Sequence, residues 1–285
     1  MYDIIIMNPP YQTKSDKNHK KTQTLWDKFV LMAITVVKND GWLCAIHPCG
    51  WRDVAGQFKS VQNVLKNKKI NYLEMHDRAD GVKTFGVQTA YDWYVLQNTD
   101  NDIKTTIVTQ DGFTKNINLQ GLDFIPNGSF DEIHALCAKN GQPSVEMLCD
   151  SSYHIQRDYV TEIETVEYKY PCIYSVLKDG TINLRWSSIN NKGHFGLAKV
   201  VFSNGSSAPI IDEYGKYGLT EFAYAIVDTP ENLHLIQKAM LSEKFLKLMA
   251  DCQLIGKHRY HYKAIKLFRK DFWKEFVDEE EKCLT

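Results

Sequence analysis

The sequence contains no run of apolar residues long enough to cross a membrane. Its most apolar early stretch, Ile4–Met7, stops at Asn8-Pro9-Pro10, whereas a membrane-spanning helix needs about 20 such residues. No basic region followed by a cleavable apolar segment marks a secretory signal. The seven cysteines are scattered and include no CxxC pair. This argues against a zinc site or a disulfide framework and predicts reduced thiols in a cytoplasm.

An excess of charge of either sign is also missing. Lys and Arg number 34 and Asp and Glu 35, for a net charge of -1. This balance excludes a uniformly basic coat protein for nucleic acid, although it allows a local basic patch. Hydrophobic residues at 44% and charged residues at 24% are ordinary values, which exclude disordered and fibrous proteins. The 285 residues suffice for one large domain or two modest ones.

Strand-like and helix-like patterns alternate over the first hundred residues. Tyr2–Met7 predicts a strand buried on both faces, and Thr24–Lys38 has the apolar spacing of a helix that ends at Asn39-Asp40-Gly41. Further expected elements are the strand Trp42–His47, the helix Gln57–Lys66, and the strands Ile70–Met75 and Ala90–Leu96. The alternation predicts an α/β fold with a parallel, doubly wound sheet. Ligands of such sheets bind beyond the carboxyl ends of the strands.

The pattern changes after about Asn98. Short candidate strands separated by turns follow, and a helical apolar stripe returns at Asn232–Met249. The turns include Asp212–Gly218, which is rich in glycine and has no evident role. A second, β-containing domain with a helical end fits this part of the chain best.

The tetrapeptide Asn8-Pro9-Pro10-Tyr11 directly follows the first predicted strand. At average composition it arises by chance in roughly one chain of this size in a thousand. With this motif the sequence resembles the adenine-specific (amino) DNA methyltransferases of the NPPY type from restriction–modification systems, which use S-adenosylmethionine. The resemblance implies a partial Rossmann-like methyltransferase sheet, the C-terminal half of a catalytic domain, in residues 1–125. It also implies an α+β target-recognition domain that binds DNA in residues 126–285.

In this family the tetrapeptide holds the target base, which assigns expected roles to its residues. The side-chain oxygen of Asn8 and the carbonyl of Pro9 would accept the N–H groups of the exocyclic amine and stabilise the charge that develops there. Pro10 keeps the backbone stiff and offers no competing N–H. Tyr11 would stack on a base flipped out of the duplex. Phe85, in the similar segment Thr84–Thr89, would form the second wall of the base pocket, the alternative being a core residue.

The motif does not select the substrate by itself. An NPPY tetrapeptide also occurs in methyltransferases that act on protein glutamine or on ribosomal RNA, since these reactions need an equally activated nitrogen. The long downstream domain favours DNA. The other interpretation is a non-catalytic DNA-binding or specificity subunit that keeps the methyltransferase fold.

The family's cofactor motif has no counterpart in the expected place. Related enzymes carry a strand and a glycine-rich turn before the tetrapeptide, but only seven residues precede Asn8 here. The glycine-containing turns 193–196 and 202–206 do not follow a strand and open a helix, so the cofactor-binding residues stay unassigned. Without neighbouring strands Asp3–Met7 would be an exposed apolar edge, which soluble proteins avoid. We therefore expect a second polypeptide to supply the half that binds S-adenosylmethionine, or this chain to be part of a longer product, or, less favoured, a second copy to cover the edge.

Two basic clusters suggest contact with double-stranded DNA, because lysine and arginine neutralise phosphates. The first contains Lys14, Lys17, Lys20 and Lys21, and the second contains Lys257, Arg259, Lys263, Lys266, Arg269 and Lys270. The alternative is a solvated surface balanced by the acidic tail Asp278–Glu281. The sequence thus predicts a cytoplasmic or nucleoid-associated protein with DNA and a second polypeptide as partners, and with neither a metal nor a membrane.

Overall fold

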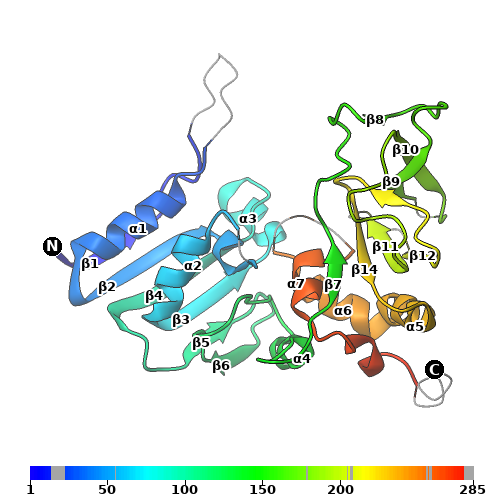
Figure 1. The fold of residues 1–285 in the computed structure, drawn as a ribbon. Coiled ribbons are helices and arrows are strands. Elements are labelled where there is room, and N and C mark those ends of the chain that lie inside the picture. The colour runs from blue at the N-terminus through cyan, green and yellow to red at the C-terminus, as the bar shows by residue number, and fades with distance from the viewer. Residues whose placement is uncertain are drawn as a thin grey trace. The chain divides into compact units, whose positions relative to one another are not determined.

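A computed structural model of the chain describes residues 1–285 except 14–22, 55, 178, 204, 206–207, 255, 257–258 and 279–285 (Figure 1). The chain divides into two compact units. Unit 1 is Met1–Gly128 with Leu254–Gly256, and unit 2 is the rest of the chain from Ser129 on. Within the described ranges, no helix combines the length and the apolar character that crossing a bilayer requires.

Unit 1 is an α/β structure around a 6-stranded sheet. Its strands are β1 (Tyr2–Met7), β2 (Val37–Pro48), β3 (Lys68–His76), β4 (Tyr91–Asp100), β5 (Thr105–Val108) and β6 (Thr114–Ile117). Its helices are α1 (Trp26–Val36), η1 (Cys49–Arg52), α2 (Lys59–Asn67) and α3 (Arg78–Phe85). The α/β class predicted for this part of the chain is confirmed.

The strand order is β1-β2-β4-β3-β5-β6. β1 pairs parallel with β2, and β3 pairs parallel with β5, but β4 lies antiparallel between β2 and β3. The expectation of a wholly parallel sheet was therefore wrong. The physical reason is that α3 and residues 86–90 stay at the edge where β3 ends, with Gly81 packed against Thr89 and Tyr91 paired with His76. The chain therefore re-enters the sheet from that edge, whereas a parallel connection has to cross to the opposite edge. The carboxyl ends of β1, β2 and β3 consequently meet the start of β4.

One face of this sheet is covered by α1 and α2, while the other is open near β1. β1, β2 and β3 follow one another in the same direction across the sheet, so right-handed crossovers place both helices on one face. Burial alternates along β2 accordingly: Leu43 and Ala45 are buried, whereas Trp42 is 37% exposed. Trp42 pairs with Ile4, which is 60% exposed, and Ile6 is 81% exposed. The described residues of unit 1 thus leave an apolar edge and an adjoining apolar face uncovered.

Two local predictions for this unit need correction. β1 was predicted to be buried on both faces, but among the described residues it is an edge strand with most of its side chains exposed. The helix predicted to run to Lys38 ends at Val36, because Val37 already adopts an extended backbone and β2 begins there. Asn39-Asp40-Gly41 lies inside β2, where Asp40 has a positive φ of 62° and the register of β1 against β2 shifts.

Unit 2 contains two 4-stranded sheets, β13-β9-β10-β8 and β12-β11-β14-β7. Its strands are β7 (Glu146–Leu148), β8 (Val160–Thr161), β9 (Tyr170–Val176), β10 (Ile182–Ser187), β11 (Lys199–Ser203), β12 (Ile210–Asp212), β13 (Gly218–Leu219) and β14 (Ala223–Val227). Its helices are α4 (Phe130–Leu136), α5 (Pro230–Leu241), α6 (Glu243–Asp251), α7 (Tyr262–Leu267) and η2 (Phe272–Glu275).

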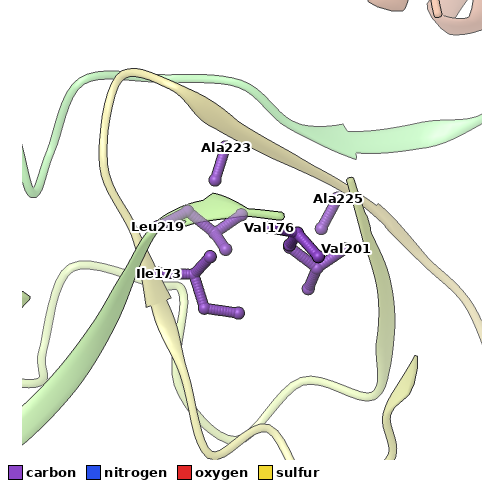
Figure 2. Close-up of a cluster of buried hydrophobic side chains, with 6 residues drawn as sticks. All are labelled: Ile173, Val176, Val201, Leu219, Ala223 and Ala225. Carbon is purple, nitrogen blue, oxygen red and sulfur yellow. The ribbon is translucent and has the colours of Figure 1, made fainter. Parts of the chain in front are cut away.

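Small and branched side chains from the two sheets form the core cluster shown in Figure 2. Its members are Ile173, Val176, Val201, Leu219, Ala223 and Ala225. The helical stripe expected over Asn232–Met249 is present and is divided into two helices, since α5 ends at Leu241 and α6 begins at Glu243. Ser242 is extended, and its hydroxyl accepts the backbone N–H of Phe245. It therefore acts as an N-cap that restarts the helix in a new direction.

His47 lies in the covered core of unit 1, at the end of β2. Its ring stacks on buried Trp26 with centroids 4.4 Å apart, and its Nε2 lies 3.1 Å from the hydroxyl of Tyr94. Burial lowers the pKa of His47 from 6.5 to about 4. The imidazole is therefore neutral in the folded protein at neutral pH.

Acid is expected to destabilise unit 1 through His47. The imidazole of His47 binds a proton more tightly in the unfolded chain than in the folded protein. The contribution of the neutral imidazole to the free energy of unfolding is therefore complete above pH 6.5 and is lost as the pH falls toward 4. The whole interval corresponds to roughly 3 kcal/mol. Urea unfolding at pH 7 and pH 4.5 measures the loss, which His47→Phe should reduce and His234→Phe, at an exposed position, should leave unchanged. An equal loss in wild type and His47→Phe would contradict the assignment.

Candidate functional site

The tetrapeptide Asn8–Tyr11 leaves the sheet at the carboxyl end of β1. Pro9 is buried, whereas Asn8 and Pro10 are exposed. The side chain of Asn8 makes no hydrogen bond within the described part of the chain, so its amide is available to a ligand. The two prolines allow few backbone conformations at this corner. The result is a stiff turn that presents an unengaged amide at the edge where ligands of such sheets bind.

The backbone at Tyr11 is hydrogen-bonded to the segment that precedes α1. Its carbonyl accepts the N–H of Leu25 at 3.1 Å, and the next residue, Gln12, forms an antiparallel bridge with Thr24. The ring is half-buried, and this burial raises the pKa of Tyr11 above its usual value. Its hydroxyl is buried and finds no hydrogen-bond partner among the described residues. A buried donor of this kind is costly, which marks Tyr11 as a residue with an unmet polar group at the site.

Phe85, the last residue of α3, meets Tyr11. The ring centroids lie 6.3 Å apart at an interplanar angle of 75°. Gly81, one turn earlier in α3, lets the helix backbone pack against the segment before β4, because a Cβ added there would lie 1.9 Å from the carbonyl oxygen of Thr89. The edge-to-face contact leaves no parallel gap between the two rings. A base held on both sides would therefore require Tyr11 or Phe85 to turn about its side-chain torsions.

Phe85 packs against Tyr91, whose ring and hydroxyl contact His76 and Asp80. Phe85 contacts the ring of Tyr91 at 5.0 Å, and Tyr91 stacks on His76 at 4.5 Å. The hydroxyl of Tyr91 donates to the carboxylate of Asp80, and this bond holds the pKa of Asp80 below its usual range. The ring nitrogens of His76 lie 3.1 Å from Asp80 and 3.0 Å from Glu74, at ion-pair distance without hydrogen-bond geometry.

Sequence reasoning did not identify His76, Asp80 and Tyr91. A signal for two of them was present, since His76 directly follows the predicted strand Ile70–Met75 and Tyr91 is the second residue of the predicted strand Ala90–Leu96. These positions lie at the carboxyl edge only because β4 runs antiparallel to β3, where His76 and Tyr91 are directly paired. Asp80 sits one turn into α3, and only the tertiary contact with Tyr91 reveals its role.

A buried ion pair anchors the loop that follows β2. Arg52 Nε lies 2.9 Å from Asp92 Oδ2, and both side chains are fully buried. Trp51 Nε1 donates to the same oxygen at 2.8 Å. Arg52 also donates to the carbonyls of Ile125 and Pro126 at 3.2 and 3.3 Å. Despite this partner, burial raises the pKa of Asp92, so the carboxylate depends on Arg52 for its charge.

The described turns at this edge do not resemble a site for the methionine end of S-adenosylmethionine. β1, β2 and β3 are followed by Asn8-Pro9, Cys49-Gly50 and Asp77-Arg78. None of these has the glycine spacing that lets backbone N–H groups approach a bound group closely. Among the described residues, no three His, Cys, Asp or Glu side chains are grouped to hold a metal ion.

The predicted basic clusters are only partly described. Lys14, Lys17, Lys20, Lys21 and Lys257 lie outside the described residues. Lys266 and Lys270 are exposed, whereas Arg259, Lys263 and Arg269 are half-buried.

Arg269 and Lys270 line a cavity of about 690 Å³ in unit 2, together with Trp273 and Lys274. Arg269 is engaged by Asp271 at 2.8 Å, and acidic residues also line the cavity. Lys270 Nζ lies 4.0 Å from Asp228 Oδ2, so Lys270 is more weakly engaged than Arg269.

Comparison with known families matches residues 1–81 to the model described as Eco57I restriction-modification methylase. This segment contains β1, the tetrapeptide, His76 and Asp80. The predicted resemblance to restriction–modification methyltransferases is thereby confirmed for the first part of unit 1. Sequence comparison with curated proteins found no match.

Solved structures similar to this chain include components of restriction–modification systems. The type IIL enzyme MmeI in complex with DNA has 13% identity and a TM-score of 0.52, covering 93% of this chain and 45% of that one. The type IIG restriction endonuclease BpuSI has 11% identity and a TM-score of 0.38, covering 96% and 48%. A type I system has 12% identity and a TM-score of 0.30, covering 47% and 29%. The chain spans less than half the length of each, and the likeness to MmeI supports the fold alone.

Proposed function

We propose that this chain transfers a methyl group from S-adenosylmethionine to the exocyclic amine of adenine in double-stranded DNA, as part of a larger methyltransferase. The observation that carries the proposal is the exposed, unengaged amide of Asn8 on the stiff corner after β1. This corner lies inside the segment that matches the methylase family.

The chemistry follows from the residue types at that corner. An exocyclic amine is a poor nucleophile, because its lone pair is delocalised into the purine ring. The side-chain oxygen of Asn8 and the backbone carbonyl of Pro9 accept hydrogen bonds from the two N–H groups of this amine. These bonds favour a localised lone pair and stabilise the positive charge that develops on nitrogen. Tyr11 stacks on the extruded base. Phe85 then closes the other side, with its position set through Tyr91 and Asp80.

S-Adenosylmethionine supplies a methyl group on a positively charged sulfonium, which makes the methyl reactive without metal or covalent intermediate. The described residues of this chain fit a site that binds the amine substrate, and they do not fit a site that binds the cofactor. We propose that another polypeptide segment completes the cofactor pocket, in a separate chain or in a longer product.

The uncovered edge of unit 1 is the proposed attachment point for that segment. Among the described residues β1 pairs with β2 alone, and its Ile4 and Ile6 are 60% and 81% exposed. A flat apolar edge of this kind is a template for another strand. Addition of a parallel strand to β1, with a helix over Ile4 and Trp42, would bury this surface.

Ile6→Asp is expected to abolish association with the segment that carries the cofactor site. A charge placed in the new sheet would be buried without a partner, which costs more than the lost apolar contact. Co-purification of the two polypeptides, followed by sedimentation, measures the association. Ile163→Asp in unit 2, at an isoleucine that is 72% exposed, is the matched control and should leave it intact. Association that survives Ile6→Asp would refute the proposed edge.

Unit 2 is the proposed DNA-reading part, as a target-recognition domain acting beside the catalytic half. Support comes from the cations Lys266 and Lys270, which are exposed, and from the fold shared with MmeI, a protein solved in complex with DNA. Phosphate contacts by such cations would give an affinity that falls steeply with salt. Contact with chromosomal DNA would place the protein in the cytoplasm, at the nucleoid.

The product of the reaction tests the proposal. The chain is co-expressed with the neighbouring coding sequence, or made as one polypeptide with it where the two are in frame. It is then incubated with labelled S-adenosylmethionine and duplex DNA of mixed sequence. Nucleoside analysis should show N6-methyladenine. Label in ribosomal RNA or protein glutamine instead, or DNA binding without any methylation, would overturn the adenine assignment.

A further inference from the structure

Two turns of unit 2 are joined into one rigid element that presents an exposed tyrosine. The turns 190–197 and 212–217, here called the paired turns, are linked by a hydrogen bond from the N–H of Gly196 to the carbonyl of Gly215 at 2.9 Å. Gly215 has a φ of +65°, and a Cβ added there would lie 2.3 Å from the backbone N of Leu197. Only glycine permits this approach, so the two turns are packed backbone against backbone.

A buried ion pair locks the paired turns in place. Lys199 Nζ lies 2.7 Å from Asp212 Oδ2, and their side chains are 0% and 3% exposed. The same ammonium group donates to the carbonyls of His194 and Leu197 at 3.0 and 3.1 Å. The carboxylate of Asp212 also accepts the backbone N–H groups of residues 216 and 217. The two buried charges of Lys199 and Asp212 thus neutralise each other, and their hydrogen bonds fix the backbone of both turns.

At the tip of this element stands Tyr214, which is 85% exposed. Within the described part of the chain its side chain has no hydrogen bond, ion pair or ring contact. Asn190, Asn191 and Lys192, in the first turn, are also exposed. The ion pair between Lys199 and Asp212 therefore fixes a turn whose aromatic ring stays exposed to solvent. Such pre-ordered aromatic and polar groups lose little freedom when they bind a partner.

The charge of the paired turns suits a polyanion better than the charge of another exposed loop of unit 2, residues 162–169. The paired turns expose Lys192 and Lys216 against one glutamate, Glu213. The loop 162–169 also exposes apolar side chains, Ile163 and Val166 among them, but it carries three glutamates and one lysine. Phosphates would be repelled there and tolerated at the paired turns. Asparagine, lysine and tyrosine are also the residue types that hydrogen-bond to base edges and phosphates.

We infer that the paired turns contact duplex DNA, with Tyr214 as the central contact, and that Lys199 and Asp212 are the positioning residues that hold it. The inference rests on the proposed function, because it identifies the part of unit 2 that meets the DNA.

Hydroxyl-radical labelling of the full chain, with and without a mixed-sequence duplex, tests the contact directly. DNA should reduce labelling of Tyr214 at least about fivefold while leaving Val166 unchanged. In a parallel measurement by fluorescence anisotropy, Tyr214→Ala should weaken binding of the same duplex by about fivefold or more. Val166→Ala, at the most exposed apolar residue of the acidic loop, is the matched control and should bind as wild type does.

The outcomes separate this inference from the proposed function. If the chain binds DNA but Tyr214 stays fully labelled and Tyr214→Ala binds normally, the paired turns are not the contact, and the proposed function stands. If the wild-type chain binds no duplex DNA, the result contradicts both the contact by the paired turns and the proposed function. Equal losses for Tyr214→Ala and Val166→Ala would also overturn the specific role of Tyr214.

Discussion

Replacing Asn8 by alanine is expected to lower the rate of adenine methylation by about 10²–10³-fold. The variant removes one of the two acceptors that we propose for the target amine and leaves the stiff Pro9-Pro10 backbone in place. Because this acceptor acts on charge that develops in the transition state, the loss should appear in the single-turnover rate. Affinity for DNA should change little, since Tyr11 and the basic residues of unit 2 remain.

The measurement uses the chain together with the segment that binds S-adenosylmethionine. Single-turnover methylation and DNA affinity are compared for wild type, Asn8→Ala and Asn39→Ala. Asn39 is an exposed asparagine in the first half of β2, away from the carboxyl edge, so its replacement controls for a general effect on unit 1. A wild-type rate for Asn8→Ala would remove the catalytic assignment, and weaker DNA binding alone would make Asn8 a binding residue only.

Arg52→Ala is expected to destabilise unit 1 by about 3–5 kcal/mol. The substitution leaves the carboxylate of Asp92 buried without its cation and strips the carbonyls of Ile125 and Pro126 of their donor. Burial already raises the pKa of Asp92, so the variant should fold with this group protonated or lose the fold of the loop. Hydrogen exchange of the β4 amides, which belong to unit 1 alone, measures the free energy of opening.

An exposed pair in the same unit supplies the control. Lys38 lies 2.7 Å from Asp3, with side chains 49% and 80% exposed, so Lys38→Ala should cost only about 0–1 kcal/mol. The double variant Arg52→Met/Asp92→Leu should recover part of the loss, because it removes the buried charge together with its partner. Equal effects of Arg52→Ala and Lys38→Ala would show that the buried pair carries no special weight.

The part of the site that could be predicted is the part encoded locally. A six-residue apolar strand followed by Asn8-Pro9-Pro10-Tyr11 needs no distant contact to form, since the prolines stop the strand and restrict the corner themselves. The α/β class followed from the alternation of strand and helix patterns. The role of each residue at that corner came from the family resemblance and stays a proposal.

Other features depended on pairings between distant residues, which local patterns do not contain. The sequence of β4 predicts a strand, but only the geometry of the short link after α3 decides that it runs antiparallel and brings Tyr91 beside His76. Asp212 and Lys199 read as ordinary surface charges until folding buries them together. The spacing of hydrophobic residues and the positions of turn residues are properties of neighbours along the chain, so they determined the elements and the corner after β1. Strand direction, buried charge and the display of Tyr214 depend on which elements meet, and the tertiary structure alone decided them.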